Sequence, residues 1–174
     1  MRTPASVAAL LCVLAFSARA QTKVSGKLSC SKPDVNSSAE VPDAAGHMVV
    51  LTKANCTWPT ALEIEGVKTK TAVDVGVSEA HGSSANGHGY NVSTMDNGDK
   101  VSVSYQGTVQ LAKDGSGTFK GTWRWISGTG KFKGIKGSGT YKGSQGADGV
   151  GSADIEGDYT LAPPAAKKGD KKPN

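Results

Sequence analysis

Apolar and polar residues alternate with a period of two along most of this chain, a pattern that predicts β-strands. The clearest example runs from Lys100 to Leu111, where apolar residues or glycine alternate with Ser, Thr or Gln. A second runs from Thr118 to Ile126 and places Trp123 and Trp125 in the same phase. We expect strands of this kind to bury one face and expose the other.

Similar alternation predicts seven further strands, at residues 23–30, 47–53, 61–67, 71–78, 88–94, 137–142 and 154–161. Gly, Asp, Asn and Ser separate them, as expected for turns. Asn97-Gly98 predicts a type I′ hairpin turn, and Asp114-Gly115 predicts another turn. Residues 31–46 are predicted to be a polar loop.

About nine short strands without helical crossovers predict an all-β antiparallel meander, closed into a barrel of about eight strands. The alternative is a β-sandwich. Glycine occurs 23 times, all after residue 20, which is about twice ordinary usage. Glycines inside the predicted strands, such as Gly107, Gly121 and Gly139, favour the barrel because closure requires sharp coiling.

The first twenty residues predict a signal for export. Met1-Arg2 is a basic start, residues 5–16 are apolar, and Ala18-Arg19-Ala20 is a small-x-small site that predicts cleavage near Ala20. The apolar run is shorter than the roughly 20 residues of a membrane crossing, and no transmembrane segment is predicted. We expect a single barrel domain at residues 21–162, in the periplasm or outside the cell.

Charge is distributed unevenly along the chain. The net charge is +5, but residues 21–162 carry fourteen basic and fourteen acidic side chains. A neutral domain argues against a nucleic-acid partner. Residues 163–174 hold four lysines and one aspartate and are predicted to be a disordered tail, suited to contact with an anionic envelope polymer.

Two cysteines, Cys30 and Cys56, remain once Cys12 is removed with the signal. An even count in an oxidising compartment predicts a disulfide between them. The alternative, a metal or redox pair, needs closer spacing or additional ligands.

Residues 127–137, Ser-Gly-Thr-Gly-Lys-Phe-Lys-Gly-Ile-Lys-Gly, carry a recognisable motif. The segment resembles the Gly-Gly-Thr-Gly-x-Phe-x-x-Ala-x-Gly signature of dirigent proteins and allene oxide cyclase barrels, and departs from it at Ser127 and Ile135. With its flanks it also resembles exported bacterial proteins of that barrel type, best over residues 88–161. The resemblance implies an antiparallel barrel that forms oligomers, and its matching residues are Gly128, Thr129, Gly130, Phe132, Gly134 and Gly137.

The three histidines, His47, His81 and His88, are the candidate metal ligands. His81 and His88 are seven residues apart in a segment interpreted as a flexible loop. Exposed loop histidines are the favoured interpretation, so no metal and no cofactor is predicted.

One face of the predicted strands is rich in aromatic side chains. These residues line a ligand cavity or form a filled core, and they are Tyr105, Phe119, Trp123, Trp125, Tyr141 and Tyr159. The favoured hypothesis is a non-enzymatic barrel that binds a small apolar ligand or serves as an envelope interaction module. The alternative is a cyclase or isomerase acting on a small apolar substrate, and a cavity with an ionisable side chain would favour it.

Overall fold

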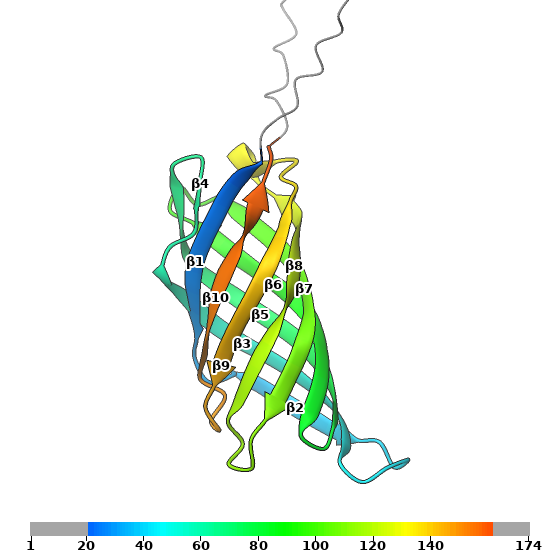
Figure 1. The fold of residues 1–174 in the computed structure, drawn as a ribbon. Helices are drawn as coiled ribbons and strands as arrows, with labels where there is room; N and C mark the ends of the chain where they lie inside the picture. The colour runs from blue at the N-terminus through cyan, green and yellow to red at the C-terminus, as the bar shows by residue number, and fades with distance from the viewer. Residues whose placement is uncertain (1–20, 162–174) are drawn as a thin grey trace, which may run out of the picture.

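Residues 21–161 are described by a computed structural model, in which they form ten strands and one turn of 3-10 helix (Figure 1). The predicted signal and the predicted lysine-rich tail lie outside the described residues. The all-β prediction is confirmed. In chain order the elements are β1 (Thr22–Cys30), β2 (Val35–Glu40), β3 (His47–Thr60), β4 (Glu63–Ile64), β5 (Val67–His81), β6 (Ser84–Met95), β7 (Lys100–Leu111), β8 (Gly117–Gly128), η1 (Gly130–Phe132), β9 (Ser138–Gln145) and β10 (Gly151–Tyr159).

Eight of the strands close into a barrel. From β5 to β10 each strand pairs antiparallel with the next one in the chain, while β3 pairs with both β5 and β1. β1 pairs along its whole length with β10, which completes the ring. The predicted barrel is therefore confirmed and the sandwich alternative is wrong, because a sandwich would leave two separate sheets.

Two stretches differ from their predictions. Residues 31–46, predicted as a polar loop, contain β2, which pairs with Met48–Lys53 of β3. β3 in turn continues to Thr60, well past the predicted end at residue 53. The strand predicted at 61–67 is instead the two-residue β4 followed by a turn, where Glu65 has a φ of 49°. β2 is exposed throughout, so no hydrophobic alternation could mark it.

Three hairpins share one turn geometry. Each has Asn or Asp before a glycine of positive φ: Asn97-Gly98 (84°), Asp114-Gly115 (85°) and Asp148-Gly149 (81°). The glycine N–H donates to the carbonyl three residues earlier, and the Asn or Asp side chain accepts the N–H two residues later. Asn97 itself does not have a positive φ. The type I′ prediction is therefore wrong, and these are type I turns followed by a glycine bulge.

The disulfide prediction is confirmed. Cys30 and Cys56 occupy directly opposed positions on β1 and β3 and are bonded. This pair of strands is the seam at which the start of the chain closes the barrel. The bond therefore links β1 covalently to β3, while β1 pairs on its other side with β10.

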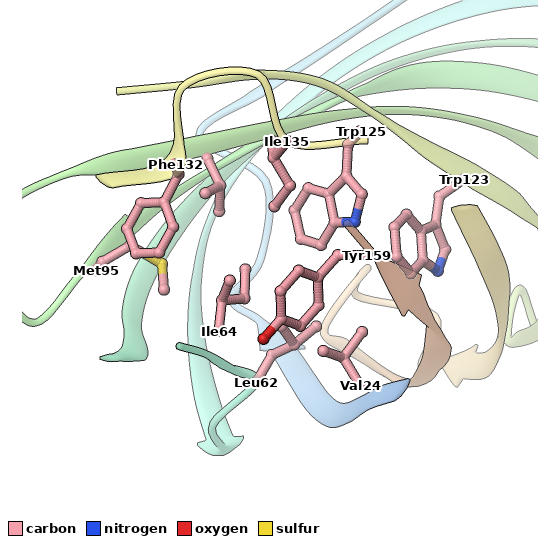
Figure 2. Close-up of a cluster of buried hydrophobic side chains, with 10 residues drawn as sticks. Val24, Leu62, Ile64, Met95, Trp123, Trp125, Phe132, Ile135 and Tyr159 are labelled. Atoms are coloured by element: carbon pink, nitrogen blue, oxygen red, sulfur yellow. The ribbon is translucent and has the colours of Figure 1, made fainter. Parts of the chain in front are cut away.

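One end of the barrel is closed by a hydrophobic cluster, which we call the end core (Figure 2). Phe132 and Ile135 come from the segment between β8 and β9 and pack toward Leu62 and Ile64, beside β4. Phe132 and Ile64 are fully buried. The remaining members are Val24, Met95, Val101, Trp123, Trp125 and Tyr159.

The motif at residues 127–137 holds this closing segment in place. The Thr129 hydroxyl accepts the Lys100 N–H at 2.8 Å, which ties the segment to the start of β7. A Cβ at Gly128 would collide with the backbone of Phe132, so only glycine fits there. Gly130 and Gly134 have positive φ values of 48° and 76°. The motif residues thus serve to turn the chain across the barrel end and deliver Phe132 into the end core.

Candidate functional site

The inward-facing aromatic rings lie flat against the barrel wall, over glycines of the neighbouring strands. The Tyr105 hydroxyl lies where a side chain at Gly76 or Gly89 would be, and the Tyr141 hydroxyl does the same at Gly107 and Gly121. The same arrangement places Trp123 over Gly139 and Gly157, and Phe119 over Gly143. The glycines therefore leave space for the rings, in addition to permitting the strands to coil. As a result the rings lie along the wall and do not cross the lumen.

This arrangement leaves a cavity of about 660 Å³ inside the barrel. Trp58, Leu62 and Trp125 line it at the end next to the end core. At the other end it reaches Lys32 and Asp148, which are exposed on the loops β1–β2 and β9–β10. The cavity is thus closed at one end of the barrel and accessible from the other, and its volume suits one small molecule.

A polar network lies in the cavity wall. Asp74 on β5 accepts a hydrogen bond from the Tyr105 hydroxyl to Oδ1 at 2.8 Å and one from Asn91 Nδ2 to Oδ2 at 3.2 Å. The Ser93 hydroxyl donates to Asn91 Oδ1 at 3.0 Å. Asn91 and Ser93 are buried, while Asp74 and Tyr105 line the cavity. Three neighbouring strands, β5, β6 and β7, thus present one carboxyl group with its donors to the lumen.

Burial shifts the titration of this network. Desolvation raises the pKa of Asp74, and the hydrogen bonds from Tyr105 and Asn91 offset part of that rise. Burial, with the nearby Asp74 charge, raises the pKa of Tyr105 far above its ordinary value. The same two causes raise the pKa of Tyr141 to about 12. Both tyrosines therefore stay protonated donors at neutral pH, and Asp74 holds its proton more tightly than an exposed aspartate does.

One buried donor in the cavity wall has no partner. Among the described residues, Trp58 Nε1 is a buried side-chain nitrogen without a hydrogen bond, and Trp58 lines the cavity. The other two indoles that line the cavity are satisfied, since Trp123 Nε1 donates to the Thr140 carbonyl and Trp125 Nε1 to the Asp158 carbonyl. Because a buried unpaired donor is costly, Trp58 is suited to an acceptor on a bound molecule.

Five of the six aromatic residues proposed from the sequence line the cavity: Tyr105, Phe119, Trp123, Trp125 and Tyr141. The sixth, Tyr159, lies in the end core, where its hydroxyl accepts the Glu65 N–H at 3.2 Å.

Sequence reasoning missed Asp74. It stands between Val73 and Val75, and alternation alone would point the valines inward. The structure has the opposite phase, because Val73 and Val75 are 36% and 37% exposed on the outer face. The available signal was Gly76, which shares the phase of Asp74 and leaves space for the Tyr105 ring.

The histidines are arranged differently from the loop interpretation, which is wrong for all three. His47 begins β3 and lies directly opposite His81 at the end of β5. His88 lies within β6, opposite Val77, and only Gly82 and Ser83 separate β5 from β6. The side chain of His47 is only 9% exposed. Alternation around His88 had already predicted a strand there, and a seven-residue spacing is compatible with a tight hairpin as well as with a loop.

His47 lies in a cluster of polar side chains on the outside of the wall. Its Nδ1 is 2.6 Å from Asp43 Oδ1, and its Nε2 is 2.8 Å from Glu79 Oε1. The same Glu79 oxygen is 3.6 Å from His81 Nε2. The hydrogen bond that His47 donates to Asp43, followed by the one that it donates to Glu79, raises the pKa of His47.

A shallow hollow of about 1370 Å³ crosses the outer face of the barrel from β6 to β1. Short polar side chains such as Ser104, Thr122 and Thr140 line it. Arg124 and Lys23 are matched there by Glu156 and Asp158, and Lys23 pairs with Asp158 at 3.5 Å. This face therefore carries charged side chains of both signs.

No protein-family model matches the chain, and no curated protein is significantly similar to it. The similarity of residues 127–137 to dirigent proteins stays a prediction. Within residues 21–161 the structure holds no helix long and apolar enough to span a bilayer.

Proposed function

We propose that this protein is an exported, non-enzymatic β-barrel that binds one small, largely apolar molecule in its lumen. The observation that carries the proposal is the cavity of about 660 Å³, walled mainly by apolar and aromatic side chains and reaching the surface at one end. Specific small-molecule sites combine such a wall with a few convergent polar groups. The disulfide supports export, since such bonds persist in oxidising compartments.

The polar groups restrict the chemistry of the ligand. Each carboxylate oxygen of Asp74 has capacity for a further hydrogen bond beyond those from Tyr105 and Asn91. Trp58 Nε1 offers a donor elsewhere on the wall. The proposed ligand is therefore an apolar body that carries a hydroxyl or amine for Asp74 and an acceptor for Trp58.

Binding of the neutral fluorescent probe N-phenyl-1-naphthylamine tests the proposal. Val50 lines the cavity, whereas the preceding residue of β3, Val49, is exposed on the outer face. We expect saturable binding to the wild type, weakened at least tenfold by Val50→Trp and unchanged by the matched control Val49→Trp. Absent binding, or equal binding to both variants, would refute a luminal site. Circular dichroism checks that both variants keep the strand content of the wild type.

Asp74 supports a second candidate, an enzyme of the cyclase or isomerase type. A carboxyl whose pKa is raised by burial, in an apolar cavity, is suited to transfer a proton to or from a bound substrate. Untargeted mass spectrometry of apolar extracts separates the two functions. A carrier returns its ligand unchanged, whereas an enzyme converts a compound that Asp74→Asn binds and leaves intact.

A further inference from the structure

We propose that His47, Glu79 and His81 bind a divalent transition metal ion such as Zn²⁺, and that Asp43 positions His47 for it. The three ligand atoms all lie within 4.8 Å of one another. Two imidazole nitrogens and one carboxylate oxygen form a donor set that suits Zn²⁺ and its neighbours in the first transition series. The site is on the outer face of the wall and is separate from the luminal cavity.

The sheet brings these ligands together. Glu79 and His81 are two residues apart on β5, so their side chains share one face. His47 is the direct cross-strand partner of His81, and the two rings are stacked with their centroids 4.1 Å apart. All three backbone positions therefore belong to paired strands of the barrel wall, and only side-chain rotations remain to be fixed on binding.

The distances between ligand atoms are close to those that a bound ion requires. Zn²⁺ bonds of 2.0–2.2 Å in a tetrahedron hold ligand atoms roughly 3.3 Å apart. Glu79 Oε1 is 2.8 Å from His47 Nε2 and 3.6 Å from His81 Nε2. The side chains of Glu79 and His81 are 56% and 57% exposed, so both have freedom to make the small adjustment.

Asp43 supplies the support that metal-binding histidines usually have. Its carboxylate is 2.6 Å from His47 Nδ1, which leaves Nε2 directed at Glu79. A carboxylate on the far ring nitrogen fixes the tautomer and orientation of the ligand. Asp43 is held nearby because the His47 N–H donates to the Ala44 carbonyl at 3.1 Å and closes the β2–β3 turn.

A bound ion would fasten two loops at one rim of the barrel. Asp43 and His47 belong to the β2–β3 hairpin, while Glu79 and His81 lead into the β5–β6 turn. At present these turns are joined by a hydrogen bond from the Gly82 N–H to the Gly46 carbonyl at 3.2 Å. Three protein ligands leave a fourth position for water or an external donor.

Calorimetric titration of the full chain with ZnSO₄, purified without a histidine tag and stripped with a chelator, tests the proposal. We expect one ion per chain. The affinity for Zn²⁺ should fall at least tenfold in His81→Ala, which removes a ligand. It should fall about 10–100-fold in Asp43→Asn, because Asp43 is not itself a ligand but holds one in position. His88→Ala is the control, since His88 is an exposed histidine on the neighbouring strand β6 and does not belong to the group of three ligands, and it should bind like the wild type.

Cobalt substitution gives a second measurement, independent of affinity. Co²⁺ in a tetrahedral nitrogen and oxygen site should give visible absorption bands that disappear in His81→Ala and persist in His88→Ala. Absent stoichiometric binding, or equal affinities of the wild type and His81→Ala, would overturn the site and leave a hydrogen-bonded cluster only. Because His81 is exposed, its substitution should not unfold the barrel, and circular dichroism checks this.

Discussion

One wall of strands encloses both halves of the barrel interior, but the two halves differ in the size of the side chains that point into them. In the half near β4 and η1, large side chains such as Phe132, Ile64 and Met95 meet in the end core and are almost fully buried. In the other half the inward positions of β5 and β6 are small, with Ser78 and Ala80 among those that line the cavity. The barrel backbone therefore does not decide whether its lumen is filled; side-chain size at inward positions does.

The difference assigns a role to each half. Packed apolar side chains supply most of the free energy of folding, whereas a hollow forfeits contacts and leaves room for a ligand. The end core should therefore dominate stability, while Asp74 and the cavity should affect binding more than folding.

The largest effect on stability should come from the end core. Phe132→Ala removes a fully buried ring and should lower the free energy of unfolding by about 3–5 kcal/mol. Urea denaturation measures this, and Ile126→Ala, on the exposed outer face of β8, should cost less than about 1 kcal/mol. A cost of Phe132→Ala no greater than that of Ile126→Ala would contradict the division between the two halves.

The next effect concerns the seam between β1 and β3. Replacing Cys30 and Cys56 together by alanine should lower the free energy of unfolding by roughly 3 kcal/mol, because the open chain gains entropy when unfolded. Denaturation of the wild type with and without a reducing agent provides the comparison. The reducing agent should not change the free energy of unfolding of the double variant. A change would show that the reducing agent affects the protein other than through this disulfide.

A smaller effect should reveal the packing of Tyr105 on glycine. A Cβ at Gly76 would lie 2.7 Å from the Tyr105 hydroxyl, while its other neighbours are at ordinary distances. Gly76→Ala should therefore cost about 1–3 kcal/mol in the wild type and clearly less in Tyr105→Phe. Gly87→Ala, whose nearest atoms are 3.5 Å away, should be neutral or stabilising. If Gly76→Ala lowered the free energy of unfolding equally in both backgrounds, the Tyr105 ring would not lie over Gly76.

The smallest effect should be a pH dependence caused by Asp74. Its pKa is raised in the folded state, so the folded protein binds this proton more tightly than the unfolded chain does. The free energy of unfolding should therefore decrease as pH rises from the unfolded pKa, 3.8, through the folded pKa, and stay reduced above it. Asp74→Asn lacks this proton, so its stability relative to the wild type should increase across that range. A difference in free energy of unfolding between Asp74→Asn and the wild type that does not change with pH would show that Asp74 has an ordinary pKa.

The fold was largely predictable because its signals are local. The Lys100–Leu111 strand matches its predicted bounds, since alternation there is uninterrupted and both ends carry turn residues. β2 was missed because an exposed edge strand has no buried face, so nothing apolar marks its register.

The candidate site was only partly predictable. The aromatic residues Tyr105, Phe119 and Trp123 could be proposed because large rings in one strand phase point to a common interior. Asp74 could not, because its valine neighbours on β5 suggest the opposite phase. The rule that apolar side chains point inward fails for the outward valines of β5. The inward phase of this strand is set instead by the aromatic ring that reaches over it from β7.

The sequence alone determined the all-β class, the disulfide and the aromatic phase of the central strands, since these depend on residue type and spacing along the chain. Only the tertiary structure decided which side of β5 faces the lumen, that the lumen is hollow, and that His47 meets Glu79 and His81. The physical reason is that a strand offers two equivalent faces. The choice between them is made by contacts with strands that are distant in sequence, here the Tyr105 ring against Gly76 and the β3–β5 pairing.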